Sequence, residues 1–190
     1  MMLSFRDIVY GIYGAWRLAR LDASAMSHFE RTVEGFWKSF FAAVIVAPAY
    51  ALILVFELSH FETGAGGARI FLVELCAYVI GWTAFPLAVH HVCGVIGKRE
   101  AFISYIVAFN WAKVIQMAVF LPTIGLIAAG IVSEETGWLV RWIVSILILG
   151  YEWFVTKTAL AVRPMAAGGF VVLDFIIDLI IHAITLGMIR

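Results

Sequence analysis

The sequence predicts an all-α protein, a polytopic membrane helical bundle of about five transmembrane helices preceded by an amphipathic N-terminal interfacial segment. Composition is the first reason. Of the 190 residues, 64% are hydrophobic and only 14% are charged, which leaves too little polar surface for a protein dissolved in water. The second reason is the presence of five apolar runs, each long enough to cross a bilayer. The third is that lysines and arginines gather at alternate ends of those runs.

The five apolar runs define the spans. A membrane-spanning helix needs about 20 mostly apolar residues, because each residue adds about 1.5 Å across a hydrocarbon layer about 30 Å thick. The runs cover residues 39–58, 70–96, 101–129, 137–158 and 169–188. We expect a helix in each, with turns at glycines 64–67 and 168–169. The third run is long enough to tilt strongly, or to break at Pro122 and leave residues 122–132 as a separate short helix. Together the runs form a transmembrane bundle over residues 39–190.

Residues 1–38 differ from the rest of the chain because their apolar residues alternate with charges. The first apolar stripe recurs at helical spacing and consists of Phe5, Ile8, Val9, Ile12, Tyr13 and Trp16. Ser4 and Asp7 fit a capping box at its start. A second stripe, which we expect to continue into the first span, consists of Met26, Phe29, Val33, Phe36 and Trp37. Such stripes are typical of helices that lie flat in the headgroup zone, so this segment is predicted to be an interfacial collar or a docking surface for a partner.

The distribution of cations predicts the orientation, because loops rich in lysine and arginine stay in the cytoplasm. One set of ends carries Arg6, Arg17, Arg20, Arg31, Lys38, Lys98, Arg99, Lys157 and Arg163. The opposite ends carry acids with few cations, namely Glu57, Glu62, Glu134 and Glu135. The sequence therefore predicts a protein of the bacterial inner (plasma) membrane with a cytoplasmic N-terminus and a periplasmic C-terminus.

Many ionisable and amide side chains fall inside the predicted spans. Each ionised group costs about 2.5–3.5 kcal/mol at mid-membrane on insertion scales, so it needs a partner, a cavity or a route to the interface. The side chains predicted to form a buried polar network are His90, His91, Asn110, Lys113, Gln116, Arg141, Glu152, Asp174, Asp178 and His182. From residue counts along each span, most of these lie in the cytoplasmic half of the bilayer, with Gln116 and Arg141 farther out.

Spacing indicates how this network is arranged. Asp174, Asp178 and His182 are four residues apart, which places them on one helical face that should point into the bundle. Similar depths favour an ion pair between Lys113 and Asp178, and a partner for Glu152 among His90, His91 and Lys157. The network would either hold the helices in register or line a path for protons, an ion or a small polar solute.

Small residues form two seams along which helices can approach closely. Ala43, Ala47 and Ala51 are spaced four apart in the first span, and Ala77 and Gly81 repeat that spacing in the second. Besides packing within the bundle, either seam could join a second copy or another membrane protein.

Several classes of function have no support in the sequence. The formal net charge is zero, so no basic excess attracts nucleic acid. His90 and Cys93 share a helical face, but no second ligand pair follows at metal-binding spacing, so we expect no metal site. Nucleophile elbows, zincin helices and paired carboxylates for hydrolysis are absent from the sequence, and we expect neither a cofactor nor an enzymatic site.

Three short motifs stand out along the chain, namely GAWRL at 14–18, GFWKSF at 35–40 and YIVAFNWAKVIQ at 105–116. They are similar to segments of small Yip1-like membrane proteins of alphaproteobacteria, and the whole layout resembles the Yip1 family, in which an amphipathic segment precedes five spans. The resemblance implies a five-span topology. Eukaryotic members are linked to Rab GTPases and vesicle traffic, but this sequence lacks their Asp-Leu-Tyr-Gly-Pro element, and for the bacterial type the resemblance implies no activity.

Three functions remain open from the sequence. The leading hypothesis is a non-enzymatic membrane protein that organises or accompanies a membrane complex, with the lipid bilayer and a membrane-protein partner or a second copy as its partners. The alternative is a proton-coupled or ion-conducting transporter that uses the buried polar network. The third is a lipid- or cofactor-binding membrane protein. Replacing Asp178 by asparagine would separate the first two.

Overall fold

The computed structural model describes residues 3–58 and 65–189. Its described residues form seven α-helices and two short 3-10 helices, and they include no strand. In chain order the elements are α1 (Phe5–Ala19), η1 (Ala23–His28), α2 (Val33–Ser39), α3 (Phe41–Leu58), α4 (Gly67–Val95), η2 (Arg99–Ala101), α5 (Phe102–Ala128), α6 (Glu134–Leu160) and α7 (Pro164–Ile189). The predicted all-α fold is confirmed.

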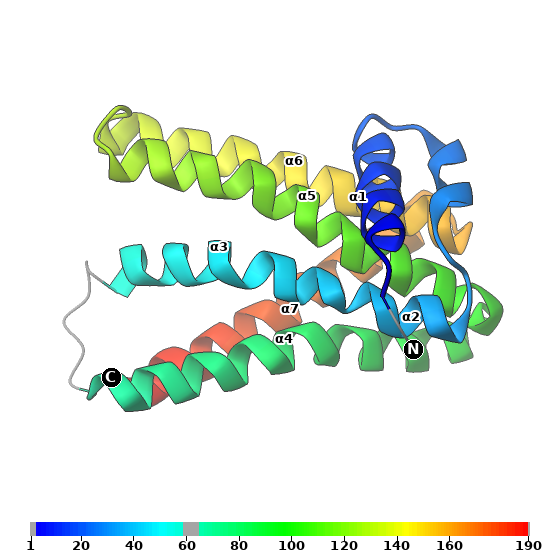
Figure 1. Ribbon diagram of the computed structural model, residues 1–190, viewed down its shortest axis with the longest axis horizontal. Coiled ribbons are helices and arrows are strands. Elements are labelled where there is room, and N and C mark those ends of the chain that lie inside the picture. The colour runs from blue at the N-terminus through cyan, green and yellow to red at the C-terminus, as the bar shows by residue number, and fades with distance from the viewer. Residues whose placement is uncertain (1–2, 59–64, 190) are drawn as a thin grey trace.

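Five segments are long and apolar enough to cross a membrane: Val33–Phe56, Gly67–Val95, Arg99–Ala128, Glu135–Leu160 and Pro164–Ile189. They run along the long axis of the molecule as an α5–α6 pair and an α4–α7 pair, with α3 between the pairs (Figure 1). The N-terminal helices α1, η1 and α2 gather at one end, which we call the collar end. The C-terminus and the α5–α6 turn lie at the opposite end, which we call the far end (Figure 1).

Helix α5 is the centre of the bundle. All residues from Tyr105 to Ala112 are buried, and the helix packs against α1, α2, α3 and α6. Aromatic rings fill this core, with Phe85 and Phe109 4.5 Å apart between ring centroids and Tyr105 5.9 Å from Phe170. Because lipid is as apolar as these side chains, the close packing of α5 rather than removal of apolar area from water holds the spans together.

The structure decides between the two alternatives for the third span and overturns one predicted turn. Helix α5 continues through Pro122 to Ala128, so the third span is a single long helix and residues 122–132 contain no separate helix. The prediction of a turn at glycines 168–169 is wrong, because both glycines lie inside α7. Of the other predicted glycine turn, Gly64 lies outside the described residues, and Gly66 caps the start of α4.

The collar helix α1 begins as the sequence predicts. The Ser4 backbone N–H donates to the Asp7 carboxylate at 3.0 Å, and the Asp7 N–H donates to the Ser4 hydroxyl at 3.2 Å, which completes a capping box. One face of the helix is made of small residues and is buried. At Gly11 that face lies directly against the indole ring of Trp111 on α5. The absence of a side chain at this position is what lets α1 cross the bundle so closely.

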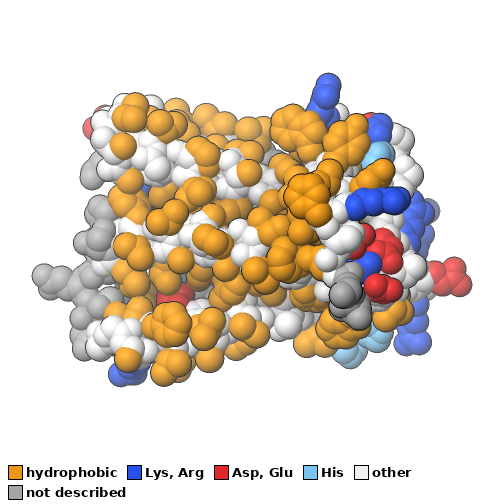
Figure 2. Space-filling view, viewed as in Figure 1, with side chains coloured by type: hydrophobic (Ala, Val, Ile, Leu, Met, Phe, Trp, Pro, Cys, Tyr) orange, Lys and Arg blue, Asp and Glu red, His pale blue; other side chains and the backbone are white. Residues whose placement is uncertain are grey.

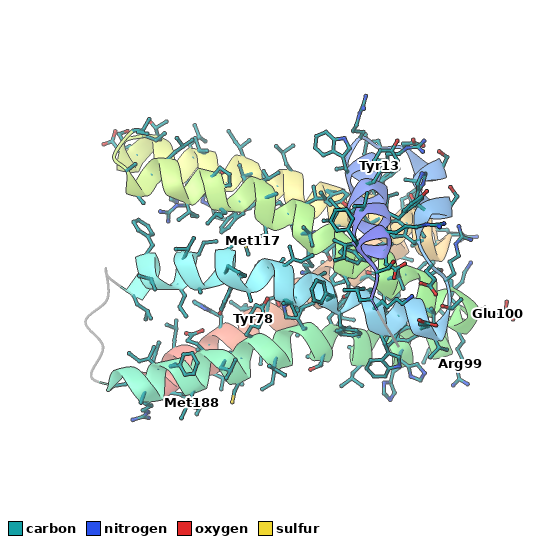
Figure 3. All side chains as sticks on the ribbon, viewed as in Figure 1. Tyr13, Tyr78, Arg99, Glu100, Met117 and Met188 are labelled. Carbon is teal, nitrogen blue, oxygen red and sulfur yellow. The ribbon has the colours of Figure 1, made fainter. Side chains whose placement is uncertain are left out.

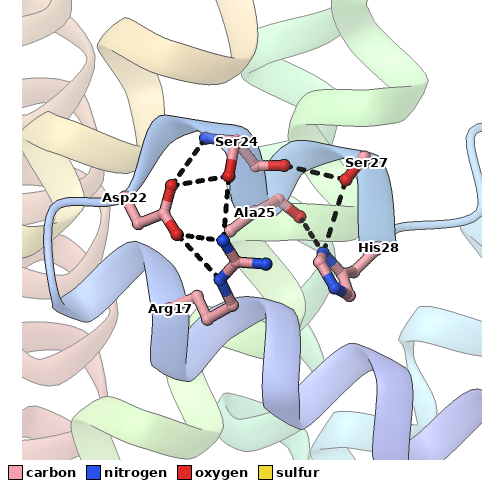
Figure 4. A network of polar contacts seen from close by, with 6 residues as sticks. All are labelled: Arg17, Asp22, Ser24, Ala25, Ser27 and His28. Carbon is pink, nitrogen blue, oxygen red and sulfur yellow. Dashed lines mark hydrogen bonds and ion pairs between the residues drawn. The ribbon is translucent and has the colours of Figure 1, made fainter.

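A polar network fixes the turn that follows α1 (Figure 4). The Arg17 guanidinium pairs with the Asp22 carboxylate and donates to the Ser24 hydroxyl at 2.9 Å. Asp22 in turn accepts from the backbone N–H of Ser24 at 3.0 Å, as the N-cap of η1. The Ser24 hydroxyl donates to the Asp22 carboxylate at 2.7 Å, and this bond, followed by the one from Arg17, favours the charged form and lowers the pKa of the Asp22 carboxyl. The network folds η1 back onto α1 and completes the collar.

The second predicted stripe continues into the first span only in part. Residues 29–32 separate η1 from α2, but Phe40 alone separates α2 from α3, and Val33–Phe56 forms one span-length segment. Thr32 caps α2 by accepting from the Gly35 N–H at 3.0 Å. Of the second predicted stripe, Met26 and Phe29 are buried, whereas Val33 and Trp37 are exposed.

The outer surface is apolar along the spans and charged at the collar end (Figure 2). Large exposed side chains on the lipid-facing sides include Leu52, Phe71, Leu87, Leu147 and Phe175. Of the acids predicted at the opposite ends, Glu62 lies outside the described residues, as do the side chains of Glu57 and Glu134, whereas Glu135 is exposed. The surface therefore has the pattern of a protein that sits in a bilayer.

Candidate functional site

An open cavity of about 380 Å³ lies among the spanning helices. All five long helices contribute to its wall. Tyr78 on α4 and Met117 on α5 both line it, and they lie on the sides of those helices that face each other (Figure 3). Its charged, amide and imidazole side chains are Glu74, Asn110, Lys113, Gln116, Asp178 and His182, and Thr185 adds a hydroxyl. The volume lies within the range of small-molecule sites.

Lys113 is the lysine of this cavity, and it is already paired. Its Nζ lies 2.9 Å from Oδ2 of Asp174 on α7 and 4.7 Å from the centroid of the Phe109 ring. Asp174 is buried and Lys113 is half-buried. The predicted ion pair between Lys113 and Asp178 is therefore wrong. Lys113 pairs instead with the acid one helical turn nearer the collar end. Counting residues from an assumed membrane boundary cannot resolve one turn, because the helices begin at different heights.

Asp178 and His182 line the cavity from the same face of α7 as Asp174. Both are exposed, in keeping with the cavity being open. Asp178 makes no hydrogen bond or ion pair within the part of the chain that the structure describes, and its electrostatic neighbours are Lys113 and Asp174. The predicted face of α7 thus points toward the cavity, with one paired acid and one free acid along it.

Glu152 on α6 joins this group from behind the cavity wall. The side chain is buried, and its neighbours are Asp174, Lys113 and Asp178. Its Oε1 has no hydrogen-bond partner among the described residues. The expected pairing of Glu152 with His90, His91 or Lys157 is therefore wrong. Three carboxyl groups from α6 and α7 surround a single lysine.

Gln116 carries the second buried polar atom without a partner. It is 92% buried, since its relative exposure is 8%; it lines the cavity, and its Nε2 has no hydrogen-bond partner in the described structure. A buried amide that is left without a partner costs about 1–3 kcal/mol, so such atoms mark places where a ligand or water is expected.

The remaining predicted network residues lie elsewhere. Asn110 lines the cavity and donates to the Ser39 hydroxyl at 2.9 Å, which ties α5 to the end of α2. His90 and His91 are exposed; His91 bonds the Leu87 carbonyl of its own helix at 2.8 Å, and His90 stacks on Phe102. Arg141 is exposed on α6 and does not line the cavity.

The small-residue seams have different surroundings. Ala77 and Gly81 line the cavity, and Ala43 accepts a hydrogen bond from the Tyr78 hydroxyl through its carbonyl at 2.6 Å. Ala43 and Ala47 are half-buried and Ala51 is exposed, whereas the buried residues of α3 are Ala42, Val46 and Ile53. The seam on α3 therefore runs beside the buried face of that helix.

The predicted polar network left out the polar and aromatic face of α4. Glu74, Tyr78 and Trp82 all line the cavity, and Glu74 accepts from the Tyr50 hydroxyl at 3.0 Å. Tyr78 lies between Tyr50, a tilted ring with its centroid 4.9 Å away, and Trp82, an edge-to-face ring with its centroid 6.2 Å away. Residues 74, 78 and 82 are spaced four apart, so the periodicity that identified the polar face of α7 would also have identified this face.

Comparisons with protein-family models, curated proteins and solved structures find no match to this chain.

Proposed function

We propose that this protein is a proton- or cation-coupled membrane carrier that binds a small solute in the cavity among its spans. The observation that supports this proposal is the group around Lys113, where Asp174, Asp178 and Glu152 come together beside an open cavity. Three acids and one lysine leave an excess of carboxyl groups. In a low-dielectric environment such an excess favours the uptake of a proton or another cation.

Two buried polar atoms without hydrogen-bond partners favour a carrier function over a purely structural role for the network. A network that only holds helices in register should satisfy its own members, because an unmade hydrogen bond weakens the lock. Here Gln116 Nε2 and Glu152 Oε1 are buried without partners among the described residues. Such atoms are expected where the occupant changes during a transport cycle.

We place this carrier in the bacterial inner membrane with the collar end in the cytoplasm, because the cations at that end include Arg6, Arg20, Lys98, Arg99 and Arg163. The collar would then lie at the cytoplasmic headgroups. No catalytic step is part of the proposal.

Proteoliposomes test the carrier directly. A potassium gradient with valinomycin would impose a potential, and a trapped pH dye would report proton entry while pools of small solutes are added. We expect entry above that of protein-free vesicles, altered by at least one pool and lost in Asp178→Asn. The matched control is Glu100→Gln, because it also turns an acid into an amide but at an exposed site on η2, away from the cavity.

Two outcomes would overturn the proposal. Proton entry equal to that of protein-free vesicles with every pool is one, and wild-type flux in Asp178→Asn is the other. If Asp178→Asn does not fold, Asp178→Glu gives a second reading, because it keeps the charge and should keep the flux.

A second candidate is a protein that organises a membrane complex through its collar. The observation in its favour is the outward face of α1, where Phe5, Val9, Tyr13 and Trp16 are all exposed. A helix at the headgroups would also expose such a face to lipid, so this candidate ranks below the carrier. Purification in mild detergent tests it: one partner in constant ratio, lost when Trp16 is changed to Ser, would support it.

A further inference from the structure

We infer that the cavity binds a small organic cation, such as a quaternary or protonated amine that also carries a polar substituent. This inference rests on the proposed carrier function and names the class of solute. It is drawn from four features of the lining: its charge, its aromatic wall, its size and its orphaned amide.

The charge of the lining favours a cation. Glu74 on α4 and Asp178 on α7 contribute carboxyl groups, whereas the ammonium of Lys113 is committed to Asp174. The other titratable side chains of the lining are His182 on α7 and the phenols of Tyr50 and Tyr78, and Glu152 on α6 adds a further acid behind the wall. With the Lys113–Asp174 pair cancelled, the lining keeps two carboxyl groups and no free ammonium among the described residues. An anionic solute would meet repulsion there.

The aromatic side of the cavity recognises organic cations better than hydrated metal ions. Tyr50, Tyr78 and Trp82 form a row of contacting rings on α3 and α4, one pair tilted and the other edge-to-face, and Phe109 and Phe120 line the cavity from α5. Ring faces attract a cation within about 6 Å, most strongly when it is poorly hydrated, as an alkylated ammonium is. That Phe109 already holds the Lys113 ammonium at 4.7 Å shows the same interaction inside this site.

Size and ligand geometry argue against a bare ion. About 380 Å³ is much more than a single metal ion fills, and the described residues contain no group of three histidine, cysteine or acidic side chains placed to hold one. The unpartnered Gln116 amide, 92% buried because its exposure is 8%, would bond a hydroxyl or carbonyl on the same solute. The carboxyl groups and rings of the cavity would therefore bind the ammonium and apolar body of the solute, and Gln116 would bind its polar group.

Binding to the purified full chain in detergent tests this class. The cationic probes are tetramethylammonium, choline and benzyltrimethylammonium, and the neutral probe is 3,3-dimethylbutan-1-ol, which has the shape of choline without its charge. Isothermal titration calorimetry should detect choline and benzyltrimethylammonium, with the neutral compound at least about tenfold weaker. Equal affinity for choline and its neutral analogue, or no binding by any cation, would overturn the inference.

Variants locate the site. We expect Trp82→Leu and Asp178→Asn each to weaken choline binding about tenfold. Trp138→Leu is the matched control, because Trp138 is exposed on α6 and lies outside the lining. Loss of binding in Trp138→Leu equal to that in Trp82→Leu would overturn the assignment. The comparison of choline with its neutral analogue uses wild-type protein and remains decisive if a variant does not fold.

The two proposals can fail separately. Asp178-dependent proton flux without binding of any ammonium probe would overturn the solute class and leave the carrier standing. Ammonium binding that depends on Trp82 and Asp178, without flux in vesicles, would support the site and overturn the carrier.

Discussion

At the scale of single residues, a missing side chain matters as much as a charge. A Cβ built at Gly11 would overlap the indole of Trp111, and a Cβ at Gly14 would lie 2.9 Å from the ring of Phe29. Glycine weakens a helix by about 1 kcal/mol relative to alanine. Its use at these two positions of α1 is explained by packing, because only glycine lets the helix approach these rings.

Gly11→Ala should therefore destabilise the protein despite the better helix propensity of alanine. Overpacking costs about 1–3 kcal/mol, which exceeds the gain of about 1 kcal/mol from propensity. Thermal unfolding in mild detergent would measure the difference. Gly150→Ala is the control, because nothing lies within 4 Å of a Cβ at that exposed position of α6. Equal effects of the two changes would refute the packing explanation.

Asp7 gives the collar a dependence on pH. The backbone N–H of Ser4 and, to a smaller extent, the ammonium of Lys38 at 3.2 Å favour the charged carboxylate and hold the pKa of Asp7 below its ordinary value of 3.8. A lowered pKa in the folded state contributes stability above the unfolded value. That contribution is lost as the pH falls through the folded pKa.

The stability advantage of wild type over Asp7→Asn should therefore be constant above about pH 5 and shrink toward zero below the ordinary value of 3.8. We expect its size to be less than about 1 kcal/mol, because the carboxyl is partly exposed. Unfolding midpoints measured from pH 6 to pH 3 give the curve. A difference that grows as the solution is acidified has the wrong sign and would rule out this role for Asp7.

At the scale of elements, hydrogen bonds and ion pairs from polar side chains link separate segments of the chain. Lys98 donates to the Ala161 carbonyl at 3.0 Å and so caps the end of α6. Tyr151 donates to the Ala15 carbonyl at 2.8 Å and ties α6 to the collar. The ion pair between Lys113 and Asp174 joins α5 to α7, two helices that otherwise meet mainly through aromatic rings such as Tyr105 and Phe170.

Lys113→Ala should destabilise the bundle by about 3 kcal/mol, because it leaves Asp174 buried without its cation. The double variant Lys113→Ala with Asp174→Ala should recover part of that loss, since the uncompensated charge is gone. Chemical unfolding in mixed micelles would measure the cycle. Arg141→Ala, which removes an exposed cation from α6, should change stability by less than about 0.5 kcal/mol. If the stability losses of Lys113→Ala and Asp174→Ala simply add in the double variant, the two side chains are not coupled.

At the scale of the whole molecule, five helices long and apolar enough to cross a membrane run between the two ends of the bundle. The N-terminal helices lie at the collar end and the C-terminus at the far end (Figure 1). Most lysines and arginines lie near the collar end, with Arg69 and Arg141 among the exceptions. The positive-inside rule therefore favours a cytoplasmic collar.

Reporter fusions should bear out that orientation. Green fluorescent protein should fluoresce when fused before α1, and alkaline phosphatase should be active when fused after α7, because the first folds in the cytoplasm and the second in the periplasm. The reversed fusions are the control and should be inactive. If the same reporter is active at both ends of the chain, the two ends lie on one side and one of the five segments does not cross.

The hydrophobicity of the sequence alone determined the number of spans and their approximate places in the chain. Each predicted run corresponds to one of the helices α3 to α7, because hydrocarbon thickness and helical rise set a length that can be counted in residues. Helices α4, α6 and α7 begin three to five residues before their predicted runs. The Ser4–Asp7 capping box was equally local. The four-residue spacing of Asp174, Asp178 and His182 identified the polar face of α7 without any knowledge of its neighbours.

Tertiary structure decided which groups meet. The relative height and rotation of α5, α6 and α7 determine that Lys113 pairs with Asp174 instead of Asp178. The same arrangement brings Glu152 beside this ion pair. The same geometry left His90, His91 and Arg141 on the outside and brought the aromatic face of α4 into the cavity wall. Along one helix, periodicity fixes which residues share a face. Between helices no such rule operates, because the offset of one helix against another depends on packing, to which every residue of both contributes.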